Sequence, residues 1–282
     1  MGDIQKDIEA AETKWLNKSY TYIKQAFEND PLPSHDHFHH LRVWKHARFL
    51  LEQIDTTGKV TDPGFIESLL ISCMFHDTGM TETKEKEHGS ASREICENFF
   101  SSDGNKPENP ELILTAIEMH DDKSYRGFGP LVKNNQLNLI TALSIADDMD
   151  AFGYTGIYRY TEIYLMRGVP IEDLGLKVIA NLSGRFNHFM SNCSGLQRMI
   201  STYIPRYNII ESFFRNYNLQ VRKIEAGENS PAGGPVGVAK QIYRHSLMNA
   251  ISIRDVAESV LESESDPYIT QYFRDLINEL DA

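Results

Sequence analysis

Apolar residues recur at helical spacing along nearly the whole chain of 282 residues. Ile4, Ile8, Ala11 and Trp15 follow this spacing at the N-terminus, and no stretch alternates with the period of two that a half-buried strand requires. Because strands ordinarily hold about a fifth to a quarter of residues, their absence favours an all-α fold. We expect helices at residues 4–27, 39–54, 63–76, 88–100, 110–120, 135–151, 156–167, 171–194, 197–217, 239–263 and 267–281.

One change in composition divides the chain. Residues 226–238, AGENSPAGGPVGV, contain four glycines and two prolines, which predicts a flexible connector. It would separate a helical domain at residues 1–225 from a C-terminal helical tail at residues 239–282. In this tail Asp266 is a predicted N-cap, and Pro267 suits the first position of the last helix.

The charge balance limits the partners of this chain. It has 28 basic and 40 acidic side chains and a net charge of -12, so we expect no attraction to long nucleic acid or to an anionic membrane. A small phosphorylated substrate remains compatible with this charge, because a metal ion and a few local cations can reverse the potential inside a pocket.

The cysteines and the N-terminus indicate a cytoplasmic protein. Cys73, Cys96 and Cys193 are odd in number and lack CxxC spacing, which favours neither a disulfide framework nor a thiolate metal site. The N-terminal residues lack the basic start and apolar core of a signal peptide, and no apolar run approaches the length of a membrane span.

Histidines are concentrated at residues 35–46, where HDHFHHLRVWKH holds five of the ten. Helical geometry selects among them: His39, Arg42 and His46 lie on related faces, whereas His40 points about a quarter turn away. We therefore expect His37 and His40 to be exposed or to cap the helix, and His39 to face the interior.

Two further segments place carboxylates where apolar side chains are expected. His76-Asp77 follows the apolar run at residues 69–75, and Asp147 shares a helix face with Ile140 and Leu143. Burying a carboxylate without a partner would cost several kcal/mol. A divalent metal ion would remove this penalty, because it favours a mixed shell of imidazole nitrogens and carboxylate oxygens.

In combination, these segments resemble the HD superfamily of metal-dependent phosphohydrolases, whose pattern is His, then His-Asp, then Asp. HDHFHHLRVWKHA is similar to the branch written H-D-x-x-H-x-x-R-V, and ADDMDAFGYTGIYR is similar to its A-D-x-x-D-A-x-G-x-x-G-I-x-R. HDTG supplies the central pair. The resemblance covers residues 35–159 and does not extend to the segment after about residue 170.

The resemblance implies an orthogonal helical bundle of the HD-domain or PDEase-like type, with extra C-terminal helices. It implies His39, His76, Asp77 and Asp147 as ligands of a divalent ion such as Mn²⁺, Fe²⁺, Mg²⁺ or Co²⁺, with Asp77 also orienting the attacking water. His88 and His120 occupy places where two-metal members complete a second site. Because His120 is followed by Asp121 rather than by a histidine, these two residues either hold a second ion or contact the substrate.

Several polar residues are candidates for substrate binding. Cations must meet the remaining phosphate charge, and Asp150 lies beside the last ligand. Arg42 could instead pair with Asp147 or Asp150, and the lysines of TETKEKEHG could belong to a solvated loop. The candidates are Arg42, Lys84, Lys86, Asp150 and Arg159.

The expected function is hydrolysis of a phosphate ester or anhydride in a small metabolite, with nucleotides as the favoured class. One alternative is a di-iron oxygenase of the same fold, which would need both metal ions. Another is a metal-stabilised module that binds a nucleotide without turning it over. The sequence leaves the substrate, the metal and the formation of a homo-oligomer open.

Overall fold

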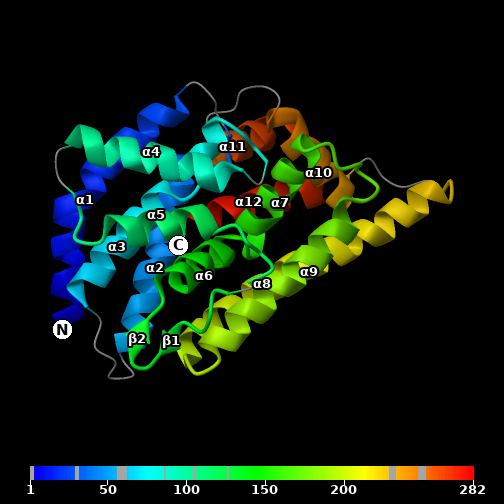
Figure 1. Cartoon of the computed structure of the whole chain (residues 1–282). Helices are drawn as coiled ribbons and strands as arrows, with labels where there is room; N and C mark the ends of the chain where they lie inside the picture. Colours follow the sequence, from blue (N-terminus) through cyan, green and yellow to red (C-terminus); the bar gives the residue numbers. More distant parts are fainter. Residues whose placement is uncertain are drawn as a thin grey trace. The chain divides into compact units, whose positions relative to one another are not determined.

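Helices dominate the computed structural model of this chain, which describes residues 3–28, 32–55, 62–85, 87–103, 106–125, 127–228, 233–246 and 252–282. These residues form twelve α-helices, one short 3-10 helix and one two-stranded hairpin (Figure 1). The prediction of an all-α fold is therefore confirmed. None of the helices in the described ranges has a stretch both long and apolar enough to cross a bilayer.

The elements follow one another along the chain in this order: α1 (Asp3–Phe27), α2 (His37–Asp55), α3 (Pro63–Phe75), η1 (Thr78–Thr81), α4 (His88–Asp103), α5 (Pro110–Met119), β1 (Val132–Lys133), β2 (Gln136–Leu137), α6 (Leu139–Asp150), α7 (Gly153–Met166), α8 (Leu174–Cys193), α9 (Gln197–Glu225), α10 (Gly234–Ser246), α11 (Ile253–Ser263) and α12 (Pro267–Asp281).

The helix predicted at residues 135–151 begins later, at Leu139, so the prediction was wrong at this end. β1 pairs with β2 in antiparallel register, and the turn residues Asn134 and Asn135 have φ values of 51° and 63°. A two-residue hairpin turn of this kind needs positive φ at both positions, which asparagine tolerates better than most residues. The turn therefore takes precedence over the helical spacing.

The helix predicted at residues 239–263 is also wrong as a single element. α10 already begins at Gly234, inside the predicted connector, because Pro235 fits the first turn of a helix. α11 has its own N-cap, Ser252, whose hydroxyl accepts a hydrogen bond from the Asp255 nitrogen. Residues 229–232 of the connector lie outside the described residues. The division at residues 1–225, 226–238 and 239–282 stays a prediction.

Contacts group the chain into two units, and the first comprises residues 1–30, 35–150 and 187–200. Its central helix is α3, which buries an uninterrupted run of side chains from Ser68 to Phe75. A helix that is apolar on all sides is stable only when it is surrounded. Accordingly α1, α2, α5 and α6 pack around α3 (Figure 1). The carboxyl end of α3, where His76 and Asp77 lie, is thereby held inside the unit.

The second unit comprises residues 31–34, 151–186 and 201–282. Within it α12 packs against α7, α10 and α11. Asp266 accepts hydrogen bonds from the nitrogens of Tyr268 and Ile269, so the predicted N-cap is confirmed. On α12, Tyr272 and Leu276 are buried, and the Tyr272 hydroxyl donates to the Tyr154 carbonyl at 3.1 Å. These two side chains of the last helix therefore pack within their own unit.

Candidate metal centre

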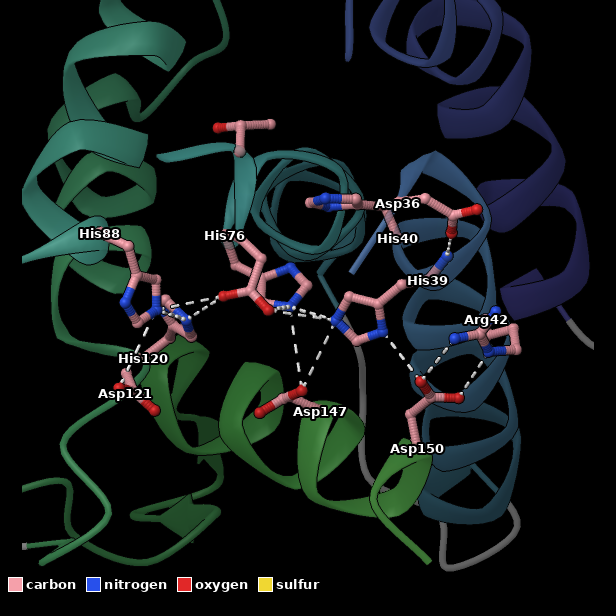
Figure 2. A network of polar contacts seen from close by, with 12 residues as sticks. Asp36, His39, His40, Arg42, His76, His88, His120, Asp121, Asp147 and Asp150 are labelled. Carbon is pink, nitrogen blue, oxygen red and sulfur yellow. Dashed lines mark hydrogen bonds and ion pairs between the residues drawn. The ribbon is translucent and has the colours of Figure 1, made fainter. Parts of the chain in front are cut away.

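An aspartate cap sets the position of His39 at the start of α2. The Asp36 Oδ1 atom accepts hydrogen bonds from the nitrogens of Phe38 and His39, both at 3.0 Å. Such a cap satisfies main-chain donors that have no partner in the first helical turn. His39 is fully buried, and its ring lies between the side chains of His76 and Asp150 (Figure 2).

Four side chains from three segments form a group that could hold a metal ion, here named the first ligand set: His39 on α2, His76 and Asp77 after α3, and Asp147 on α6. The His39 Nε2 atom is 3.1 Å from His76 Nε2 and 3.3 Å from Asp77 Oδ2. The Asp147 Oδ1 atom is 3.8 Å from His39 Nε2 and 3.9 Å from His76 Nε2. All four residues are buried, and one potential ligand atom from each lies within 4.8 Å of the others.

A second ligand set adjoins the first through Asp77. The other carboxylate oxygen, Asp77 Oδ1, is 2.9 Å from His120 Nε2 and 3.2 Å from His88 Nε2. The two imidazole nitrogens are 3.3 Å apart. Asp121 lies close by, with Oδ2 at 3.9 Å from His88 Nε2 (Figure 2). The two oxygens of one carboxylate therefore face two different groups of imidazoles.

The hydrogen bonds of the rings orient their Nε2 lone pairs toward the ligand sets. His39 Nδ1 donates its hydrogen to Asp150 Oδ2 at 2.8 Å. The other three rings donate their Nδ1 hydrogens to main-chain carbonyls, His76 to Cys73, His88 to Glu85 and His120 to Ile117. Such partners fix the tautomer of a metal-binding histidine.

The spacing of the imidazoles fits a bound metal ion. Two bare nitrogens facing each other at 3.1 Å repel unless a proton or a cation lies between them. Two nitrogens that both bind the same ion at about 2.1 Å lie roughly 3.0 to 3.4 Å apart when the nitrogen–metal–nitrogen angle is between a right angle and the tetrahedral angle. The donors present, imidazole nitrogens and carboxylate oxygens, therefore suit a divalent transition metal in both chemistry and spacing.

The charges of these groups depend on their surroundings. Burial lowers the pKa of His76 to about 3, so this ring is neutral and able to bind an ion. Burial acts to raise the pKa of Asp77, but the neighbouring imidazoles outweigh it and hold the pKa well below its usual value. Burial acts to lower the pKa of His88, but Asp77 raises it to about 9. An ion at the second set must displace that proton.

Asp150 connects the first ligand set to Arg42. The Arg42 guanidinium donates to both oxygens of Asp150, at 2.9 Å from Nε and 3.1 Å from Nη2, while Asp150 holds His39. His46 Nε2 is 3.4 Å from the same carboxylate. Of the roles that the sequence left open for Arg42, the structure thus shows pairing with Asp150. Contact of Arg42 or Asp150 with a substrate stays a prediction.

The remaining predicted substrate residues are placed as follows. Lys84 is half-buried between η1 and α4, and Lys86 lies outside the described residues. Arg159 is buried on α7, in the second unit, and is not a member of either ligand set. The roles of these three residues stay predictions.

The expectation that His37 and His40 are exposed or act as caps was wrong. His40 is fully buried, its Nδ1 donates to the Cys73 carbonyl at 3.2 Å, and its ring contacts that of Phe27. His37 is 9% exposed and contacts the ring of Tyr20. The helical-face argument considered a single helix, whereas α2 packs against α1, α3 and α6 and is buried over a wider face.

Gly79 allows α4 to approach the second ligand set. A Cβ at this position would lie 2.1 Å from the His88 carbonyl oxygen and 2.6 Å from the Ser92 nitrogen. We expect Gly79→Ala to move His88 away from Asp77, and so to weaken Mn²⁺ binding at the second set about 10- to 100-fold. The crowding should also destabilise the fold by about 1–3 kcal/mol. Calorimetric titration and urea unfolding measure the two effects.

Gly184→Ala on α8 is the matched control for this substitution. Apart from its chain neighbours and the adjacent backbone of α8, no heavy atom lies within 4 Å of the added Cβ, so we expect a gain of about 0.5–1 kcal/mol in stability and unchanged metal binding. Wild-type affinity at the second set of Gly79→Ala would contradict the assigned role of this glycine.

The sequence reasoning missed Lys123 beside the ligand sets. Its Nζ atom is 2.9 Å from Asp147 Oδ2 and 3.3 Å from Asp148 Oδ1. The available signal was its place three residues after His120, in the polar run Asp121-Asp122-Lys123. Nothing in the helical pattern indicated that this loop returns to α6.

Comparison with known proteins agrees with the geometry. Residues 38–152 match the model of the family described as HD domain. This range includes both ligand sets, Arg42 and Asp150. No curated protein and no solved structure matches the chain.

Proposed function

Residues 38–152 of this chain are an HD domain, and from this premise we propose a metal-dependent phosphohydrolase that acts on a small phosphorylated metabolite, with nucleotides as the substrate class. The observation that carries the proposal is the position of Asp77. Its Oδ2 atom faces His39 and its Oδ1 atom faces His88 and His120. A carboxylate between two ligand sets is suited to bridge two ions, an arrangement common in enzymes that cleave phosphate esters.

Two groups of residues, which share Asp77, would hold the metal ions. His39, His76, Asp77 and Asp147 would hold one ion, and Asp77, His88 and His120 a second. When bound, such ions lower the pKa of water and polarise a phosphoryl oxygen. Asp77, kept deprotonated by its neighbours, can accept a hydrogen bond from the attacking water and so orient it.

The net charge and the cysteines indicate the partners and the cellular compartment of the proposed enzyme. The net charge of -12 argues against long nucleic acid and an anionic membrane, and a small anionic substrate stays possible where a metal ion and local cations reverse the potential. Three buried free cysteines suit the reducing cytoplasm, where we place the protein. A homo-oligomer stays an open prediction.

A substrate panel tests the proposal. We expect phosphate or pyrophosphate release from one class of nucleotide or phosphorylated metabolite when Mn²⁺, Mg²⁺, Co²⁺ or Fe²⁺ is supplied. The Asp77→Ala protein is the blank, and a chelator should abolish the release in the wild type. Silence across the whole panel with metal-loaded wild-type protein would contradict hydrolysis.

The second ligand set also supports a competing function. A di-iron oxygenase needs two ions, and this structure brings His88 and His120 together at Asp77. Oxygen consumption by the iron-loaded protein, without phosphate release, would favour this function. Tight nucleotide binding with neither reaction would favour a sensor.

A further inference from the structure

Lys123 places a positive charge beside Asp147 of the first ligand set. Its ammonium contacts Asp147 Oδ2 at 2.9 Å, Asp148 Oδ1 at 3.3 Å and the His120 carbonyl at 3.3 Å. Its side chain is 13% exposed, whereas that of Asp147 is 5% exposed, so the lysine has the greater access to solvent. We propose that Lys123 is a catalytic residue that binds the phosphate of the substrate, an inference that rests on the proposed hydrolase.

The loop after α5 holds Lys123 in this position. The Asp122 Oδ1 atom accepts hydrogen bonds from the Ser124 nitrogen at 3.1 Å and from its hydroxyl at 2.6 Å, which closes a tight turn around the lysine. Tyr125 then adopts a φ of 53°, a region that a bulky side chain rarely occupies. Strain of this kind persists where surrounding contacts fix it.

Those contacts are made by Tyr125 itself. Its hydroxyl donates to Asp148 Oδ2 at 2.7 Å, and its ring stacks on His188 with centroids 3.9 Å apart and planes inclined by 10°. His188 Nδ1 lies 3.2 Å from the same Asp148 oxygen. The loop is therefore tied to α6 on both sides of Ser124, through Lys123 and through Tyr125.

Both carboxylates that pair with Lys123 have other interaction partners. Asp148 is fully buried and also interacts with Tyr125 and His188, so it does not depend on the lysine alone. Asp147 directs its other oxygen toward His39 and His76, where a divalent ion would share its charge. With an ion bound, the ammonium can therefore attract a third anion, and a substrate phosphate is the anion that the proposed reaction supplies.

Arg42 is less suited to this role. Its guanidinium is engaged by both oxygens of Asp150, which in turn holds the Nδ1 side of His39, the side away from the ligand set. Turning Arg42 toward a substrate would leave the buried Asp150 carboxylate without its main counter-charge, at a cost of several kcal/mol. If Lys123 turns, Asp148 keeps its contacts with Tyr125 and His188, and a bound ion would share the charge of Asp147.

Binding of inorganic pyrophosphate to the Mn²⁺-loaded full-length protein tests the inference without requiring turnover. A hydrogen bond to a charged group contributes about 1.5–3 kcal/mol, so we expect Lys123→Met to weaken pyrophosphate binding about 10- to 150-fold. Mn²⁺ affinity, measured separately by calorimetry, should be equal or higher, because the substitution removes a positive charge near the ion. Lys123→Arg should keep a substantial part of the pyrophosphate affinity.

Lys133→Met on β1 is the control, since Lys133 is exposed and belongs to neither ligand set. Circular dichroism checks folding, and Lys123→Gln serves as the second variant. Pyrophosphate affinity within about threefold of wild type in both Lys123→Met and Lys123→Gln would overturn the inference. A tenfold or larger loss of Mn²⁺ affinity with pyrophosphate binding otherwise intact would overturn it as well, because Lys123 would then only position Asp147. Failure of the proposed function is a separate result, namely no turnover of any panel substrate by the wild type.

Discussion

Asp77→Ala is expected to lose metal ions from both ligand sets together with all hydrolysis, while its helical circular dichroism stays that of the wild type. Asp77 belongs to both ligand sets. A complete four-ligand site provides about 10–16 kcal/mol of binding free energy, so one ligand represents roughly a quarter of it. We therefore expect affinity at each set to fall at least about a hundredfold.

The fold should survive this substitution because Asp77 lies beyond the last residue of α3. The packing of α3 depends on the apolar run that ends at Phe75, which is untouched. Metal content after dialysis, calorimetric titration with Mn²⁺ and circular dichroism measure the three expectations. Asp173→Ala, a change at an exposed carboxylate of the second unit, is the control and should behave as the wild type.

The comparison of single-set variants sharpens this prediction. His39→Ala should impair the first set and His88→Ala the second, each leaving one binding step in the titration. Asp77→Ala should remove both steps. An Asp77→Ala protein that still binds Mn²⁺ with wild-type affinity at either set would contradict the bridging role of this carboxylate.

Asp150→Ala is expected to lower both the metal affinity of the first ligand set and the stability of the fold, for two different reasons. Without Asp150, the His39 ring loses the acceptor of its Nδ1 hydrogen, and loss of such a partner typically lowers metal affinity about 10- to 100-fold. The second ligand set has no contact with Asp150 and should keep its affinity. Two-step calorimetric titration distinguishes the sets.

Stability should fall for a different reason. Asp150 is fully buried and Arg42 has 18% of its side chain exposed, so the substitution removes the carboxylate that accepts two hydrogen bonds from a mostly buried guanidinium. Breaking such a pair costs about 3–5 kcal/mol. Adding Arg42→Met should restore part of the stability, measured by urea unfolding, without restoring metal affinity. Unchanged affinity at the first set of Asp150→Ala would sink the proposed link from Asp150 through His39 to the ion.

Local signals explain why the helices were predictable. Asp266 and Pro267 mark the start of α12, and Asp62 with Pro63 does the same for α3. Caps and helical spacing act over three or four residues, so they can be recognised without knowledge of the rest of the chain. Where two local signals compete, as at Asn134 and Asn135, spacing alone gave the wrong helix start.

Contacts between segments far apart in the sequence could not be predicted from these local patterns. His40 was expected to be exposed or to cap the helix but is fully buried, because the sequence does not show how many helices surround α2. Lys123 was overlooked, because its importance comes from a loop that returns to α6.

The sequence by itself determined the helical class and the candidate ligands His39, His76, Asp77 and Asp147, since both depend on residue type, order and short-range spacing. Only the tertiary structure decided which other side chains these residues meet. It placed Asp150 against His39 across 111 residues and His120 against Asp77 across 43. Such pairs form because the helices bury their apolar faces against one another, and the resulting arrangement brings together groups that no local periodicity connects.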